Sequence, residues 1–161
     1  MAKNKIDKTN AMRILDRNKV KYDVLTYTVD ESDLSGEHAA AELGLDPEIV
    51  FKTLVLKGDR SGHIVACIPV AETLDLKALA RASGNKSIEM IHVKDLFDLT
   101  GYIRGGGSPI GMKKQFPTYL HSSAQSMEKM VFSAGQRGVQ IVAALSDIQK
   151  VTRAEFCEII L

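Results

Sequence analysis

The sequence predicts an α/β chain of the α+β type, in which helices surround a mixed β-sheet that can curl into a barrel. Segments rich in β-branched and apolar residues, which are typical of strands, recur along the chain. Helical segments do not separate them regularly, and this argues against a doubly wound parallel sheet. With 161 residues, the chain has the length of one domain, which we expect to span residues 1–161.

Three segments combine helical apolar spacing with helix-capping residues. The first begins after Thr9, whose side-chain oxygen can accept a hydrogen bond from the first turn. The second runs over Ser35–Leu43 and the third over Asp75–Ser83, and both start at a residue of the same capping type. Gly44 and Gly84 follow them, as expected at helix C-termini. The sequence therefore predicts three short, amphipathic helices.

The predicted strands are short runs of β-branched and apolar residues. Ile49–Leu56 and Ile64–Pro69 flank the loop Gly58-Asp59-Arg60-Ser61-Gly62, and this arrangement predicts a long hairpin. Further strands are expected at Lys21–Tyr27, Ser87–Met90, Thr118–His121, Lys129–Ser133 and Gln140–Ala144.

Charge and cysteine content exclude several classes of protein. A net charge of +1 argues against strong, independent binding to nucleic acid, so contact with a nucleic acid would be local or shared with a partner. Cys67 and Cys157 are the only cysteines, which favours a reducing, cytoplasmic setting over a disulfide scaffold. No apolar run approaches about 18 residues, so neither secretion nor membrane spanning is expected.

Residues 101–111 contain five of the 12 glycines in the chain, which indicates that the backbone comes close to a ligand here. The consecutive N–H groups of Gly105, Gly106 and Gly107 can form a nest that binds an anion. A tight surface turn is the alternative explanation. The spacing of a phosphate-binding Walker A loop is absent.

Ser108 lies in this loop but is a poor candidate for a nucleophile. In the serine-hydrolase elbow, the residue after the nucleophile donates its backbone N–H to the oxyanion, and Pro109 has none. A role in shaping the loop or in hydrogen bonding is therefore expected for Ser108. The four histidines and two cysteines show no metal-ligand spacing, so we expect no metal and no cofactor.

Lys52 is the most informative charged residue. If residues 50–56 form a strand, alternation places Lys52 on one face together with Val50, Leu54 and Leu56. A lysine on such an apolar face either extends to the edge of the sheet or lines a cavity.

Four motifs in order resemble the YbaK/EbsC family of Cys-tRNA(Pro)/Cys-tRNA(Cys) deacylases: Val50-Phe51-Lys52-Thr53-Leu54, Pro69-Val70-Ala71 with Leu74-Asp75-Leu76-Lys77, the loop 101–111, and Ser133-Ala134-Gly135-Gln136-Arg137-Gly138. The resemblance extends from about Thr9 to Ile159. It implies a mixed sheet curled into a barrel and surrounded by helices, related to the editing domain of bacterial prolyl-tRNA synthetase. The implied activity is the removal, in trans, of cysteine from mischarged tRNA(Pro).

The resemblance also implies roles for individual residues. Lys52 would hold the terminal adenosine of the tRNA and its phosphate. Backbone N–H groups in the loop that runs from Gly105 and Gly106 through Ser108 to Pro109 would stabilise the oxyanion that develops at the aminoacyl carbonyl. The implied substrate-binding residues are Tyr27, Thr53, Gly107, Ser133 and Gln140. No protein nucleophile is implied, because the thiol of the substrate cysteine would attack its own ester. Members of the family are accordingly classified both as lyases and as hydrolases.

Three positions depart from other members of that family. Ser35 stands where some members have an aromatic residue, Gln140 where some have an acid and Gly107 where many have a bulkier residue, so selectivity for cysteine does not follow from the sequence. The alternatives are a deacylase for alanine or serine, and a module that binds adenosine or a tRNA 3′ end without turnover. The expected partners are mischarged tRNA(Pro) and prolyl-tRNA synthetase, with no membrane.

Overall fold

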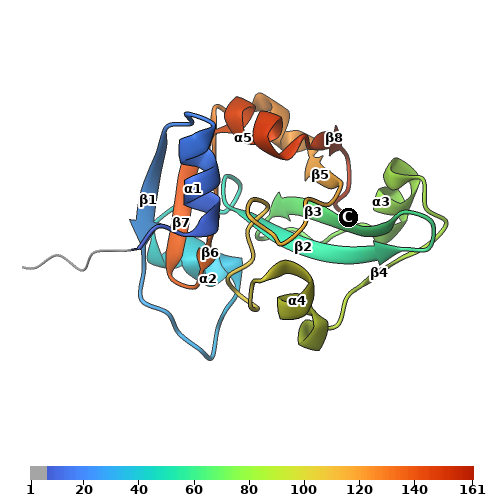
Figure 1. Ribbon diagram of the computed structural model, residues 1–161, viewed down its shortest axis with the longest axis horizontal. Coiled ribbons are helices and arrows are strands. Elements are labelled where there is room, and N and C mark those ends of the chain that lie inside the picture. The colour runs from blue at the N-terminus through green and yellow to red at the C-terminus, as the bar shows by residue number, and fades with distance from the viewer. Residues whose placement is uncertain (1–6) are drawn as a thin grey trace, which may run out of the picture.

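The computed structural model describes residues 7–161 and contains helices and strands in an irregular order (Figure 1). The helices are α1 (Asn10–Arg17), α2 (Gly36–Glu42), α3 (Leu76–Ser83), α4 (Val93–Thr100), α5 (Leu145–Thr152) and a 3-10 helix, η1 (Ser122–Ser126). The strands are β1 (Tyr22–Thr26), β2 (Phe51–Gly58), β3 (Gly62–Pro69), β4 (Ile88–Met90), β5 (Thr118–His121), β6 (Lys129–Gln136), β7 (Val139–Ala144) and β8 (Glu155–Cys157).

The strands form two sheets, and the prediction of a barrel was wrong. One sheet has the order β1-β7-β6 and the other β4-β2-β3-β5-β8. Between residues 7 and 161 neither sheet closes on itself, and the strand pairing between the two sheets is limited to an isolated parallel bridge from Val50 to Val131. The mixed character was predicted correctly: β5 pairs in parallel with β3 and β8, whereas the other strand pairs are antiparallel.

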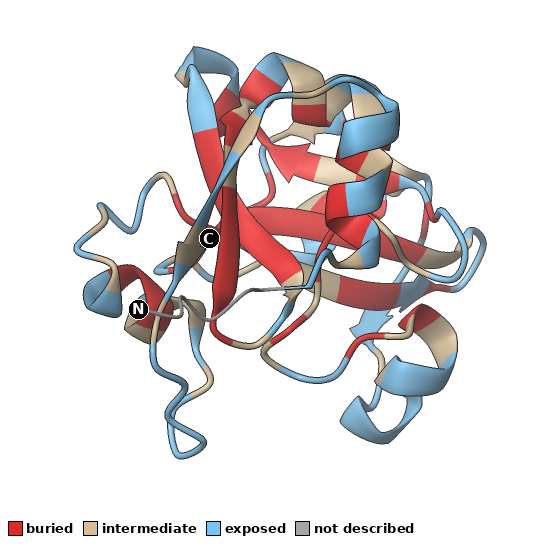
Figure 2. Cartoon of the chain, turned by 60° about the vertical axis from the view of Figure 1, so that its left-hand side comes forward, coloured by how far each residue is buried: buried red, intermediate tan, exposed pale blue. Residues whose placement is uncertain are grey.

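The predicted hairpin is confirmed, and its two strands lie inside the larger sheet. β2 pairs with β3 from Phe51 opposite Pro69 to Gly58 opposite Gly62. Alternation along β2 sends Phe51 and Val55 into the largest core cluster, which α1, α5, β6 and β7 also contribute to. These segments appear as buried strands flanked by partly buried helices in Figure 2.

The opposite face of β2 packs in two separate places. Leu56 joins a cluster with Leu79 of α3, and Val50 joins another with Ala40 of α2. Lys52 lies on this face between the two clusters. The first turn of α2 approaches this lysine, since a Cβ at Gly36 would lie 3.9 Å from the Cβ of Lys52.

The three predicted helices start where their capping residues indicated. Thr9, Ser35 and Asp75 each accept a hydrogen bond from the first turn, at 3.3, 3.1 and 3.1 Å respectively. Capping signals did not indicate α4 and α5, whose N-cap residues, His92 and Ala144, make no side-chain capping bond. Among residues 7–161, none of the helices has the length and apolar character needed to cross a membrane.

Candidate functional site

A cavity of about 670 Å³ opens between the two sheets and the segments that cover them. Its wall is made by the end of β1, the loop and first turn before α2, the first half of β2, the segment from β4 through α4 to the glycine loop, and the facing strands β6 and β7. Segments far apart in the sequence therefore meet at one concave site.

The cavity brings together most of the residues that the sequence singled out. Its lining includes Tyr27, Lys52, Thr53, Gly105, Gly107, Ser133 and Gln140. Gly106, Ser108 and Pro109 are buried and do not line it. The position of Lys52 decides between the two explanations left open by the strand pattern, because this side chain lines a cavity. Within residues 7–161, Lys52 makes no ion pair.

The glycine loop is held in a defined shape by hydrogen bonds. The N–H of Gly106 donates to the carbonyl of Ile103 at 2.9 Å, so it closes a turn and is not free for a ligand. The fully buried hydroxyl of Ser108 accepts from the N–H of Ile110 at 3.3 Å. This contact agrees with a loop-shaping role for Ser108. The N–H groups of Gly105 and Gly107 make no hydrogen bond within the described part of the chain and adjoin the cavity.

The glycines of the loop are needed for different reasons. Gly105 has a φ of +84°, and a Cβ there would lie 3.2 Å from the Cβ of Leu34. A Cβ at Gly106 would lie 3.3 Å from the backbone nitrogen of Arg137. A Cβ at Gly107 would meet no atom within 4 Å, so this position leaves the cavity open. Close packing thus explains Gly105 and Gly106 but not Gly107.

A buried tyrosine that sequence reasoning missed supports the loop from within. The hydroxyl of Tyr102 donates to the carbonyl of Ile110 and lies where Gly111 has no side chain, while its ring packs where Gly135 has none. Burial raises the pKa of Tyr102 to about 12, which keeps the hydroxyl protonated. Tyr102 therefore ties the glycine loop to β6 while also lining the cavity.

The facing sheet contributes polar groups to the cavity. The hydroxyl of Ser133 accepts from the N–H of Gly135 at 3.1 Å. Gln140 is only 6% exposed, and its Oε1 has no hydrogen-bond partner. Such an unpaired buried amide oxygen is costly, which marks Gln140 as a side chain whose hydrogen bonding is incomplete without a ligand or a rearrangement.

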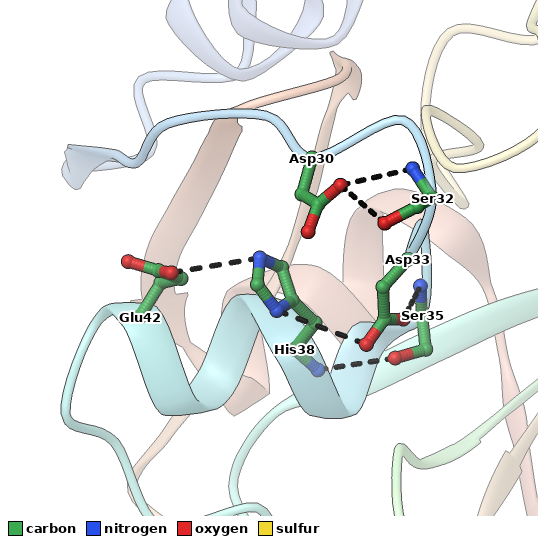
Figure 3. A network of polar contacts seen from close by, with 6 residues as sticks. All are labelled: Asp30, Ser32, Asp33, Ser35, His38 and Glu42. Atoms are coloured by element: carbon green, nitrogen blue, oxygen red, sulfur yellow. Dashed lines mark hydrogen bonds and ion pairs between the residues drawn. The ribbon is translucent and has the colours of Figure 1, made fainter.

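The segment before α2, from which Ser32, Asp33 and Ser35 line the cavity, is acidic and internally hydrogen-bonded, as Figure 3 shows. Asp30 accepts from the N–H and hydroxyl of Ser32 at 2.9 and 2.6 Å, and Asp33 accepts from the N–H of Ser35 at 3.1 Å. Hydrogen bonds from these two serines hold the pKa values of Asp30 and Asp33 below their usual range. Ser35, where relatives were expected to have an aromatic residue, thus caps α2 and orders this wall.

His38 lies beside the same wall and connects it to the end of α2. Its Nδ1 is 3.8 Å from Asp33, and its Nε2 is 3.6 Å from Glu42 (Figure 3). Both distances are longer than a hydrogen bond, and Nε2 has no hydrogen-bond partner within the described residues. Across residues 7–161, the histidine, cysteine and acidic side chains form no group of three or more that could hold a metal ion.

The cavity offers no reactive cysteine of its own among the described residues. Cys67 lies on β3 opposite Thr53, with 3.8 Å between its sulfur and the threonine hydroxyl. Burial raises the pKa of Cys67 to about 12, so its thiol is inert at neutral pH.

Comparison with known proteins agrees with this geometry. The family model described as the aminoacyl-tRNA editing domain matches residues 31–151, which include the glycine loop, Lys52 and Gln140. The chain belongs to the aminoacyl-tRNA editing domain family. This membership confirms the resemblance identified from the four sequence motifs.

Similar proteins are found at the levels of both sequence and structure. The chain is 52% identical over 160 residues to the "Putative Cys-tRNA(Pro)/Cys-tRNA(Cys) deacylase EbsC" of Enterococcus faecalis, covering 99% of this chain and 98% of that protein. Its fold is similar to the crystal structure of a hypothetical protein, with a TM-score of 0.85, 17% identity and coverage of 95% and 100%. It is also similar to the crystal structure of "a putative trans-editing enzyme for prolyl tRNA synthetase", with a TM-score of 0.80, 20% identity and coverage of 94% and 95%.

The editing-domain cavity also contains residues that no sequence signal revealed. Besides Tyr102, these are the acidic Asp33 and Glu37 and the apolar residues around α4 that include Met90, Val93, Leu96 and Ile103. The helical spacing of the α4 residues could have indicated a helix, but not which cavity it borders.

Proposed function

We propose that this chain is a trans-editing aminoacyl-tRNA deacylase that removes cysteine mischarged on tRNA(Pro). The observation that carries the proposal is the convergence of Lys52, Gly105 and Gly107 on one cavity. A cation and free N–H groups are the donors needed for a phosphate and for an ester that becomes negatively charged as it is attacked. The 52% identity to the EbsC protein supports cysteine as the amino acid.

In the proposed complex, the ammonium of Lys52 binds the terminal adenosine phosphate and orients the ester. The N–H groups of Gly105 and Gly107 point to the carbonyl oxygen, while Gly106, Ser108 and Pro109 hold the loop that presents them. One such donor is typically worth about 2.7–4 kcal/mol of transition-state stabilisation. Tyr27, Thr53, Ser133 and Gln140 complete the polar wall around the substrate.

We further propose that the substrate supplies the nucleophile. The cysteine sulfur attacks its own ester carbonyl, a carbon–sulfur bond forms, the carbon–oxygen bond to the ribose breaks, and the thiol proton passes to the departing ribose oxygen. The products are a cyclic thioester and free tRNA. Orientation of such an intramolecular group can lower the barrier by about 7–11 kcal/mol. The inert Cys67 supports this assignment.

The wider setting is part of the same proposal. The chain acts as one domain spanning residues 1–161, in the cytoplasm, and prolyl-tRNA synthetase helps it to select the tRNA. The net charge of +1 supports a partner, because the chain has little excess positive charge for binding tRNA alone.

The proposal is tested by measuring release of labelled cysteine from Cys-tRNA(Pro) by the wild type and by Lys52→Ala. Lys57→Ala is a matched control, because Lys57 is an exposed lysine of the same strand outside this cavity. We expect Lys52→Ala alone to lose most of the activity. Equal rates for Lys52→Ala and the wild type would contradict the role of Lys52. Faster release of alanine or serine than of cysteine from the same tRNA would show that cysteine is not the preferred amino acid.

A further inference from the structure

One side of the cavity mouth is unusually apolar. Four large hydrophobic side chains there are exposed, with exposed fractions of 47% for Met90, 61% for Val93, 55% for Phe97 and 47% for Ile103. We call these four residues the α4 rim. Met90, Val93 and Ile103 also line the cavity, and Phe97 follows Val93 by one helical turn, so the rim is continuous with the cavity. Most of α4 is coloured as exposed in Figure 2.

Basic side chains accompany the α4 rim. The ammonium of Lys113 lies 5.4 Å from the centre of the Phe97 ring and donates to the carbonyl of Asp98 at 3.2 Å. Its aliphatic part packs against Gly101, where a Cβ would lie 3.5 Å from the Lys113 Cγ. Arg104 is exposed and lines the cavity beside Ile103. The rim thus combines an exposed aromatic face with fixed positive charge.

Acidic groups lie on both sides of the α4 rim. Asp33 and Glu37 line the cavity from the segment that leads into α2. The acidic residues of α4, Asp95 and Asp98, line a second cavity, which shares Met90 and Ile91 with the first. On the side of the α4 rim that lines the main cavity, a polyanion meets the cationic Arg104, whereas over the segment before α2 it meets the acidic Asp33 and Glu37.

We propose that the α4 rim binds the unpaired nucleotides that precede the terminal adenosine of the substrate RNA. Their bases stack on Phe97 and on the apolar side chains beside it, and their phosphates lie near Lys113 and Arg104. Stacking on an aromatic ring accepts any base, and nearby cations neutralise the backbone. This inference rests on the proposed function, since the strand that enters the cavity must cross its mouth. The charge of the rim favours RNA over a protein partner.

The test uses an uncharged RNA hairpin with a single-stranded 3′ end ending in CCA, and the same hairpin without those three nucleotides. Fluorescence anisotropy gives Kd for the wild type, Phe97→Ala and Phe97→Tyr. Leu76→Ala is the control, because Leu76 is an exposed apolar residue of α3 that lines neither the main nor the second cavity. We expect about a tenfold weaker Kd for Phe97→Ala with the full hairpin only. Phe97→Tyr and Leu76→Ala should bind like the wild type.

The outcomes separate this inference from the proposed deacylase activity. Equal binding of the full hairpin by Phe97→Ala and wild type, or no binding by either, overturns the inference. If Phe97→Ala instead loses only stimulation by prolyl-tRNA synthetase, the rim is a protein-docking surface and the inference is wrong. Failure of the wild type to release cysteine would contradict the proposed activity, while a weaker Kd for Phe97→Ala would still support RNA binding by the rim.

Discussion

Replacing Gly106 by alanine should slow deacylation by roughly 100-fold, whereas Gly107→Ala should leave the glycine loop in place. The difference follows from what each new methyl group would meet. At Gly106 it would lie 3.3 Å from the nitrogen of Arg137 and 3.5 Å from the Cα and carbonyl carbon of Gln136. These backbone atoms cannot rotate aside, so the loop must move. At Gly107 no atom lies within 4 Å.

The size of the effect comes from the donors that the loop presents. Free N–H groups stabilise an oxyanion only at donor distances of about 2.7–3.1 Å, and the loss of one donor costs about 2.7–4 kcal/mol, or about 10²–10³-fold in rate. Movement of the loop by a few tenths of an ångström weakens the donors at Gly105 and Gly107, so we place the loss at the lower end. The crowding itself should lower the free energy of unfolding by about 1–3 kcal/mol.

The assay is the single-turnover rate of cysteine release from Cys-tRNA(Pro), measured below the unfolding temperature of both variants. Urea denaturation establishes that each variant is folded under the assay conditions. Neither glycine has a positive φ, so backbone strain does not distinguish them. A rate for Gly106→Ala within a factor of about three of that for Gly107→Ala would refute the reasoning about the oxyanion donors.

Three further predictions test the packing, the cysteine and the acidic wall. Gly135→Ala should lower the free energy of unfolding by about 2–5 kcal/mol in urea denaturation, because Gly135 has a φ of +96° and a Cβ would lie 2.7 Å from the Tyr102 ring; a loss below about 1 kcal/mol would contradict this packing. Cys67→Ala should keep its rate of cysteine release within about threefold of the wild type, because burial raises the pKa of Cys67 to about 12; a loss of activity in a folded variant would argue against a substrate thiol. The pKa of Asp33 is held below its ordinary value of 3.8 by hydrogen bonds from Ser35, so its contribution to stability is present above pH 3.8 and is lost as pH falls through the lowered pKa. Below about pH 4, the free energy of unfolding of Asp33→Asn should therefore depend less on pH than that of the wild type. Equal slopes of this free energy against pH in the two proteins would exclude the contribution of Asp33.

The parts of the fold that depend on local signals were predictable from sequence. Thr9, Ser35 and Asp75 mark helix starts because a capping side chain acts on the turn next to it. The β2–β3 hairpin was predictable because its loop joins two adjacent strands. By contrast, α4 and α5 begin at His92 and Ala144 without a side-chain capping bond, so this signal was absent.

Long-range pairing explains the error about the barrel. The strands could be recognised from their composition. Whether β1 and β6 remain edge strands or pair with strands of the other sheet depends on contacts between segments that are distant in the sequence. A sheet can be recognised from strand composition, whereas closure cannot.

The candidate site was predictable as a set of residues but not as an arrangement. Lys52 and the glycine loop stand out by residue type. The turn that uses the N–H of Gly106, the side chain of Tyr102 between two glycines and the unpaired Oε1 of Gln140 depend on tertiary contacts. The apolar α4 rim became apparent only when the helix was placed beside the cavity.

The most direct test of the central claim compares two substrates under single-turnover conditions. Wild-type protein is mixed with Cys-tRNA(Pro), or with the same tRNA carrying an analogue that lacks the thiol, and release of the labelled amino acid is followed. Our account predicts rapid release of cysteine and release of the analogue close to the spontaneous rate in buffer. Cysteine release no faster than in buffer would contradict the deacylase activity, and equal rapid release of both would contradict attack by the substrate thiol.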